Sequence, residues 1–297
     1  MRMSSRSSNR SFQALRLLAL AAVAVVLVAC SVVRLAYNQA GNLAYWQLNR
    51  AFDLNPTQVT QVKDGLNEFF KWHRQAELPV YGQLLNRAAK EAQGSITPEL
   101  ACERRLEFER VGRRSMDHAV PFLAELVRSL SPAQIRHLQA FFDDSNEDFR
   151  DDYLPSDPED RQEAAAKFVI KWTEFFYGRL SKAQREQLAK GVAEQPMTAQ
   201  DVDDERVRVQ QEFLQIARRV TGDKLTQAQT EQLLRAMIQQ GFEPSTEPRR
   251  GKLASWISSG CALTAVTHNG TSAEQRNKVS ETLTNWEKDL KILASDR

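Results

Sequence analysis

The sequence has 297 residues, of which 26% are charged and 42% hydrophobic, and it contains only 12 glycines and 10 prolines. So few chain-breaking residues exclude collagen, low-complexity polymers and turn-rich β-sandwiches, and they favour long helices. The three cysteines are too few for a disulfide scaffold and include no Cys-x-x-Cys pair typical of structural zinc, so the core must come from apolar packing.

The first thirty residues have the pattern of a bacterial lipoprotein signal peptide. Four arginines, Arg2, Arg6, Arg10 and Arg16, precede an uninterrupted apolar run over residues 17–29. This run is about 13 residues long, whereas a membrane-spanning helix needs roughly 20. It ends in Leu27-Val28-Ala29-Cys30, which resembles a lipobox. We therefore expect a signal peptide over 1–29, lipidation of Cys30 and a tether over 30–34. An ordinary secreted protein is the alternative.

The residue after Cys30 and the charge of the mature chain indicate where the protein works. Ser31 stands where aspartate would be the familiar signal for retention in the inner membrane. By this resemblance we expect a lipid anchor in the outer membrane, on its periplasmic face, and an envelope protein as partner. Cleavage removes four arginines and leaves 36 Lys and Arg against 38 Asp and Glu. This balance argues against nucleic-acid binding, which needs a basic surface.

Residues 35–297 are predicted to form a single all-α domain, either an irregular multi-helix bundle or a helical array. Apolar residues recur at spacings of three and four after residue 54, as in Val59, Val62, Leu66 and Phe69. Strands are not predicted, because alternating apolar and polar runs with hairpin turns are missing from the sequence. Pro121 is expected to kink or split the helix over 98–128. The proline-containing loop at 243–250 is a candidate subdomain boundary.

Four of the predicted helices begin with the same short pattern. Each reads Leu, a capping residue, two further positions and Gln, at residues 54–58, 130–134, 180–184 and 225–229. Such a capping box satisfies free backbone amides at a helix N-terminus, and the leucine can pack as a hydrophobic staple. Looser versions are Thr97-Pro98, Thr198 with Asp201, and Thr271 with Glu274.

The repeated Leu-Ser/Thr-x-x-Gln pattern is also similar to the motif of Spy-type periplasmic chaperones, although helix capping alone accounts for it. A more extensive resemblance covers most of the mature chain. It is carried by Tyr37-Asn38, Trp46, Asp53-Leu54, Trp72-His73-Arg74, Glu77-Leu78-Pro79, Tyr81, Ser131-Pro132-Ala133-Gln134, Asn146, Arg150, and Trp172 before Leu180-Ser181. These residues resemble a family of uncharacterised Gram-negative outer-membrane lipoproteins. The resemblance implies a helical, lipid-anchored protein and supplies no catalytic residue.

A candidate binding surface begins just after the tether. Asn38 and Asn42 would lie on one face of a helix, beside the aromatic side chains of Tyr37 and Trp46. A polar seam of this kind could be an interface. The alternative is that the amides bond to neighbouring helices while the aromatic rings pack or lie near lipid headgroups.

The same candidate surface includes His73, Arg74 and Glu77. His73 and Glu77 are four residues apart, so they share a helix face, and Arg74 is adjacent to the histidine. They could form an acid–base pair or half of a metal site. No further ligand is apparent, so we predict no metal site and favour a hydrogen-bonded structural histidine.

Cys102 and Cys261 are the two thiols that remain after lipidation. In an oxidising compartment they could form a disulfide, but both also fall on apolar stripes where free thiols would be buried. The acidic run between Asp143 and Asp152 does not fit a calcium loop, because Phe149 occupies the position of the required glycine. It is either a solvated helix face or a docking surface for a basic partner.

The sequence contains no Gly-x-Ser-x-Gly, His-Glu-x-x-His or glycine-rich phosphate motif, so no catalytic residue and no cofactor are predicted. We expect a non-enzymatic binding, scaffold or chaperone-like module of the cell envelope. The alternative is a hydrolase or transferase acting on envelope polymers, with carboxylates converging from separate helices. A concave apolar groove without perturbed acids would favour binding, whereas buried Asp or Glu residues meeting in a deep pocket would favour catalysis.

Overall fold

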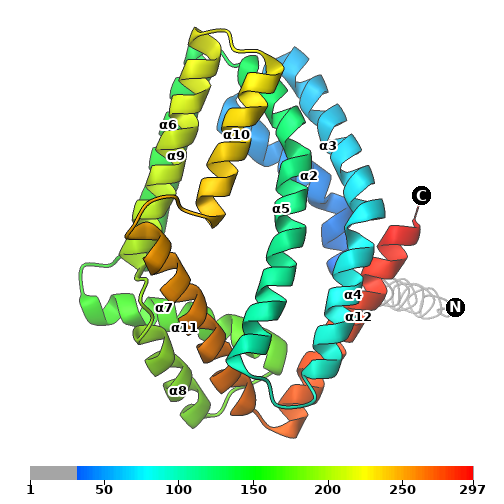
Figure 1. The fold of residues 1–297 in the computed structure, drawn as a ribbon, viewed down its shortest axis with the longest axis vertical. Coiled ribbons are helices and arrows are strands. Elements are labelled where there is room, and N and C mark those ends of the chain that lie inside the picture. The colour runs from blue at the N-terminus through cyan, green and yellow to red at the C-terminus, as the bar shows by residue number, and fades with distance from the viewer. Residues whose placement is uncertain (1–31, 297) are drawn as a thin grey trace, which may run out of the picture. The chain divides into compact units, whose positions relative to one another are not determined.

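A computed structural model describes residues 32–296, and α-helices are the only regular elements in that range (Figure 1). The prediction of an all-α protein is therefore confirmed. The helices are α2 (Val32–Phe52), α3 (Pro56–Ala76), α4 (Leu78–Glu91), α5 (Pro98–Arg128), α6 (Pro132–Tyr153), α7 (Pro158–Tyr177), α8 (Lys182–Ala193), α9 (Ala199–Gly222), α10 (Gln227–Phe242), α11 (Arg249–Asn269) and α12 (Ala273–Ser295). The predicted signal peptide and Cys30 lie outside the described residues.

The chain divides into two compact units, one ending at Ala40 and the other running from Gly41 to Arg297. In the second unit α4 packs along α12, α6 packs along α9, and α5 lies beside both α10 and α11 (Figure 1). The residues between α10 and α11, which include most of the proline-containing loop, connect two helices inside this unit. Across residues 32–296, no helix combines the length and the apolar character needed to cross a bilayer.

The helices begin where the capping pattern places them. Asn55, Ser131, Ser181 and Thr226 each accept a hydrogen bond from the backbone N–H of a glutamine three residues on, and each glutamine bonds back to the cap. Thr198 and Asp201 form the same box at the start of α9, and Thr97 caps α5. Because these contacts are local, they can be recognised in the sequence before any packing is known.

The start of α12 corrects one prediction by a single residue. Ser272 is the cap and Gln275 completes the box, in place of the predicted Thr271 and Glu274. Thr271 is buried, and its hydroxyl donates to the carbonyl oxygen of His268 at 2.6 Å. Thr271 therefore closes the preceding helix, α11, and the chain turns into α12 one residue later.

Pro121 does not split α5, which continues from Pro98 to Arg128. A proline inside a helix leaves the carbonyl four residues earlier without its usual N–H partner. That carbonyl belongs to Asp117, and it accepts a hydrogen bond from Nη1 of Arg235 on α10 at 3.1 Å. The carbonyl of Pro121 accepts a second bond, from Gln227 Nε2 at 2.8 Å. Side chains of α10 thus compensate for the proline and join α10 to α5.

The main core lies where α3, α5, α6, α9 and α10 meet. Fully buried side chains from these helices include Val62, Val120, Leu126, Leu138, Leu214, Ala217 and Leu234. They occupy the apolar stripes that the three- and four-residue spacing predicts, and their removal from water is the main driving force for packing these helices together.

A disulfide joins Cys102 on α5 to Cys261 on α11, with Cα atoms 5.3 Å apart. The two cysteines are 159 residues apart in the sequence. The bond therefore ties α11, which follows the last proline-containing loop, to a helix from the first half of the chain.

Candidate functional site

The candidate surface proposed from the sequence is spread over two regions of the chain. Tyr37 and Asn38 belong to the unit that ends at Ala40, and Asn42 and Trp46 begin the second unit. Asn38, Asn42 and Trp46 are exposed. The guanidinium of Arg50 lies over the Trp46 ring, 5.6 Å from its centroid. His73, Arg74 and Glu77 lie at the end of α3, in the second unit.

The buried carboxylate of Glu77 is bound by an arginine of α5. Arg114 donates from Nε to Oε1 at 3.1 Å and from Nη2 to Oε2 at 2.7 Å. The ring of His73 packs against those of Phe69 and Tyr81. Burial lowers the pKa of His73, and the nearby charge of Glu77 only partly opposes this shift. With both oxygens of Glu77 bonded to Arg114, this geometry is that of a structural ion pair between α5 and the α3–α4 junction.

Arg74 also has a structural partner. Its Nη1 donates to the carbonyl oxygen of Leu293 in the last turn of α12, at 2.9 Å. A cation at a helix C-terminus satisfies a free carbonyl and interacts favourably with the helix dipole. Among residues 32–296, no three His, Cys, Asp or Glu side chains gather in a way that could hold a metal ion.

A buried histidine that the sequence analysis leaves without a role lies on α11. Nε2 of His268 is 2.8 Å from the carbonyl oxygen of Gly94, and Nδ1 is 2.9 Å from the hydroxyl of Tyr177. A carbonyl can only accept, so Nε2 carries the proton and Nδ1 accepts from the tyrosine. Burial lowers the pKa of His268 and raises that of Tyr177 to about 12. The spacing of Cys261, Ala265 and His268 on one buried face is the sequence signal that could have identified it.

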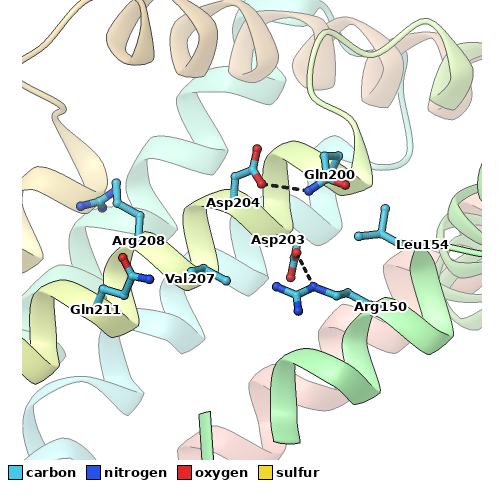
Figure 2. A pocket seen from close by; sticks show the side chains of 8 residues that line it. All are labelled: Arg150, Leu154, Gln200, Asp203, Asp204, Val207, Arg208 and Gln211. Atoms are coloured by element: carbon cyan, nitrogen blue, oxygen red, sulfur yellow. Dashed lines mark hydrogen bonds and ion pairs between the residues drawn. The ribbon is translucent and has the colours of Figure 1, made fainter. Parts of the chain in front are cut away.

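A shallow polar pocket of about 580 Å³ lies between α6 and α9 (Figure 2). Asp203 is buried, and its Oδ2 accepts from Nε of Arg150 at 2.8 Å. Asp204 instead accepts from Gln200, at 2.9 Å. Figure 2 shows the two carboxylates directed to different partners, as expected for successive residues of a helix, which point about 100° apart. They do not form a converging acid pair.

A larger cavity of about 890 Å³ lies among α5, α6, α7, α8, α9 and α11. Its apolar wall includes Phe149, Tyr153, Leu154, Phe168, Val169, Val192, Met197, Val202, Trp256, Ile257 and Leu263. Cys261 of the disulfide also lines it. Leu154 and Gln200 line both this cavity and the polar pocket, so the two adjoin. We call the larger space the apolar cavity.

Among residues 32–296, the charged residues that line the apolar cavity are two arginines, Arg105 and Arg161, and no Asp or Glu lines it. Arg105 forms an ion pair with Glu109 at 2.6 Å. Arg161 donates from Nη2 to the carbonyl of Ser156 at 3.0 Å, and its Nε is buried without a hydrogen-bond partner within residues 32–296. The cavity thus combines an apolar wall with an incompletely satisfied cationic group.

An exposed row of aromatic side chains extends along α7 from the apolar cavity. Phe168, Trp172 and Phe175 are 49%, 51% and 53% exposed. Neighbouring ring centroids lie 6.5 and 5.9 Å apart, and Phe175 also contacts Trp286 of α12. Because Phe168 also lines the cavity, the row and the cavity form one continuous apolar surface.

The acidic run of α6 lies in solvent. Six side chains, those of Asp143, Asp144, Glu147, Asp148, Asp151 and Asp152, are all exposed. In contrast, Asn146, on the same helix, is buried and exchanges amide hydrogen bonds with Gln210 of α9, at 2.7 and 3.1 Å. The acidic residues therefore face away from the seam between α6 and α9.

The apolar cavity could not be predicted from the sequence. Its walls come from six helices, and each lining residue reads in isolation as an ordinary apolar or polar position of an amphipathic helix. Arg161 gives no local signal either, because it lies in the first turn of α7 among acidic residues. Only the packing of distant helices brings these side chains together.

Comparison with known proteins identifies the family. The chain matches a family of unknown function (DUF6279) over residues 50–241, well over half of its length, and it belongs to that family. No curated protein and no solved structure matches the chain. The matched region contains most of the cavity wall, while the wall contributed by α11 lies beyond it.

Proposed function

We propose that this protein is a non-enzymatic binding module of the cell envelope, anchored by a lipid on Cys30 to the periplasmic face of the outer membrane. In this proposal the apolar cavity holds an apolar group of the binding partner. The observation that carries it is the cavity itself. Its volume of about 890 Å³ falls within the about 300–1,000 Å³ range of small-molecule sites, and no carboxylate from the described part of the chain lines it.

The carboxyl groups support binding over catalysis. A general acid needs a raised pKa at neutral pH. Within residues 32–296, the carboxyl groups with clearly shifted pKa values, among them Asp201 and Glu205, are all shifted downward. For Asp201 and Glu205 burial acts to raise the pKa, but hydrogen bonds from Lys252, Arg208 and Arg249 outweigh it. Asp201 and Glu205 are therefore ion-pair partners of these basic residues.

The aromatic row of α7 supports the same proposal. Three half-exposed aromatic side chains on one helix face are costly to leave in water, and such patches commonly mark interaction sites. The capping boxes do not support a binding role, because their glutamines are engaged in hydrogen bonds at helix N-termini. The proposal therefore does not depend on the similarity to Spy-type chaperones.

A photoactivatable long-chain alcohol, uncharged and added to cells that express the full chain, tests the proposal. Irradiation should label peptides from the cavity-lining parts of α7 and α11. Gly260 lines the apolar cavity and has no atom within 4 Å of where a Cβ would lie. The substitution Gly260→Phe should therefore fill the cavity and remove most of the labelling.

Gly112→Phe is the matched control. Gly112 also lies inside a helix with open space at its Cβ position, but it does not line the cavity. This variant should be labelled like the wild type. Equal labelling of the Gly260→Phe variant and the wild type would refute binding in the cavity.

A further inference from the structure

We infer that the apolar cavity binds a long acyl chain with an anionic head group, a carboxylate or a phosphate, which pairs with Arg161. This inference rests on the proposed function and names the class of ligand. It is carried by the apolar wall, the sign of the charged lining residues and the incompletely bonded guanidinium of Arg161.

The polar groups of the wall are mostly bonded within the protein. Gln195 donates to the Gly191 carbonyl at 3.0 Å, and Gln200 donates to Asp204 at 2.9 Å. The hydroxyls of Thr198 and Thr264 donate to Asp201 and to the Gly260 carbonyl. Because these donors are already used, they offer little to a ligand with polar groups along its length.

Because most polar groups of the wall are already hydrogen-bonded within the protein, the cavity suits an acyl chain better than a peptide segment. Each residue of a bound peptide brings a backbone N–H and a C=O, and burying these groups without partners costs free energy. An acyl chain has no polar atoms along its length and carries them only at one end. The cavity has a similar character, because apolar side chains form most of its wall and, among its lining residues within 32–296, Arg161 alone has a buried side-chain nitrogen without a partner.

The positive charge of the cavity lining favours a ligand with a negatively charged head group. Arg161 has no ion-pair partner within the described part of the chain, whereas Arg105, the other charged lining residue, is paired with Glu109. Nε of Arg161 is buried without a partner although Nη2 donates to Ser156. A guanidinium binds a carboxylate or phosphate through parallel N–H donors. An anionic head group would therefore supply the counter-charge that Arg161 lacks within residues 32–296, which an uncharged hydroxyl cannot do.

The test compares two photoactivatable probes with the same chain, a fatty acid and the corresponding alcohol, in cells that express the full protein. The acid should label the cavity peptides at about tenfold lower concentration than the alcohol, the ratio expected for one charge-assisted hydrogen bond. Arg161→Gln should remove this preference by weakening labelling by the acid, so that the acid and the alcohol label the cavity peptides at similar concentrations. Arg105→Gln, at an arginine that already has a partner, should keep most of the preference.

Each other result has a distinct meaning. If acid and alcohol label equally and Gly260→Phe blocks both, the head-group inference fails while the proposed function stands. If neither probe labels the cavity, both fail. If the preference depends on Arg105 and not on Arg161, the assignment to Arg161 is wrong. Labelling that appears only in a Cys30→Ser variant would show that the protein's own lipid occupies the cavity, which also overturns the inference.

A third probe, a photoactivatable lysophosphatidic acid, distinguishes the two sources of an anionic head group. Stronger labelling by the fatty acid would indicate a free carboxylate, and stronger labelling by the lysolipid would indicate a phosphate. In either case the dependence on Arg161 is the expected result. Labelling of the Arg161→Gln variant at the wild-type level by both anionic probes would refute the inference.

Discussion

Gln58 and Gln134, each the third residue of its own helix, hydrogen-bond to each other where the N-termini of α3 and α6 meet. Nε2 of Gln134 donates to Oε1 of Gln58 at 2.7 Å, and the reverse bond measures 3.3 Å. Each Oε1 also accepts from the backbone N–H of its own cap, Asn55 or Ser131. Gln184 and Gln275 pair in the same way at the N-termini of α8 and α12. The repeated capping motif thus both starts helices and joins them in pairs.

The first prediction concerns Gln134. Its Nε2 also donates to the carbonyls of Phe52 and Asp53, each at 3.0 Å, in a buried environment. Gln134→Ala should lower the free energy of unfolding by about 3 kcal/mol, because it removes a cap and leaves buried acceptors unsatisfied. Gln229→Ala is the control, since Gln229 is exposed and caps only its own helix. It should cost about 1 kcal/mol. Denaturant unfolding measures both, and equal losses would contradict the role of the pairing.

The second prediction concerns the disulfide. A cross-link that closes a loop across 159 residues restricts the unfolded chain and should stabilise the fold by about 5 kcal/mol in the chain-entropy model. The double variant Cys102→Ser, Cys261→Ser should therefore unfold at a lower denaturant concentration than the wild type. Reductant should lower the midpoint of the wild type and leave that of the double variant unchanged. A wild-type midpoint that does not respond to complete reduction would contradict this prediction.

The third prediction concerns pH. His268 has a pKa lowered by burial in the folded protein, against an ordinary value of 6.5. Above pH 6.5 the histidine is neutral in both states, so its contribution to stability is fully present. As the pH falls below 6.5 the unfolded chain binds a proton first, so the free energy of unfolding should decrease. Burial also lowers the pKa of His73, so this histidine should change the free energy of unfolding in the same direction.

Unfolding measured between pH 7.5 and pH 5 tests the sign of this effect. His268→Gln removes a titrating group and should flatten the pH dependence. His137→Gln is the control, because His137 is exposed. A free energy of unfolding that rises on acidification below pH 6.5, and does so less in the His268→Gln variant, would show that the shift has the opposite sign.

The fourth prediction concerns the ion pair in the polar pocket. The side chain of Asp203 is 3% exposed and that of Arg150 is 50% exposed. Removing the arginine leaves a buried carboxylate without its counter-charge, so Arg150→Ala should destabilise the fold by about 3 kcal/mol. Asp203→Asn leaves the arginine free to reach water and should cost less. If Asp203→Asn lowers the free energy of unfolding more than Arg150→Ala does, this prediction is wrong, and the cost of breaking the pair does not come from the buried carboxylate.

The sequence predicts the local part of the fold well. The capping residues of α3, α5, α6, α8, α9 and α10 all lie where the pattern places them, because a capping box involves only four consecutive residues. The predicted start of α12 is wrong by one residue, because Thr271 and Ser272 are both good capping residues. The burial of Thr271 decides between them, and burial depends on the tertiary fold.

Features made by distant segments could not be predicted in the same way. The carbonyl of Asp117 that Pro121 leaves without a helical partner is bonded by Arg235, which is more than a hundred residues away. The partner of Glu77 is Arg114 on another helix, and the sequence spacing pointed only to His73. The apolar cavity requires six helices, and the sequence did not decide whether Cys102 and Cys261 form a disulfide or remain buried thiols.

The position of the disulfide bears on how the cavity could vary among relatives. Cys102 lies within the segment shared with the family, whereas Cys261 lies beyond it, on the helix that supplies Trp256, Ile257 and Leu263 to the cavity. One side of the cavity therefore comes from a helix beyond the matched segment, and the disulfide joins that helix covalently to a helix within it. A chain that ended with the matched segment would lack the side of the cavity that α11 supplies, and it would also lack this disulfide.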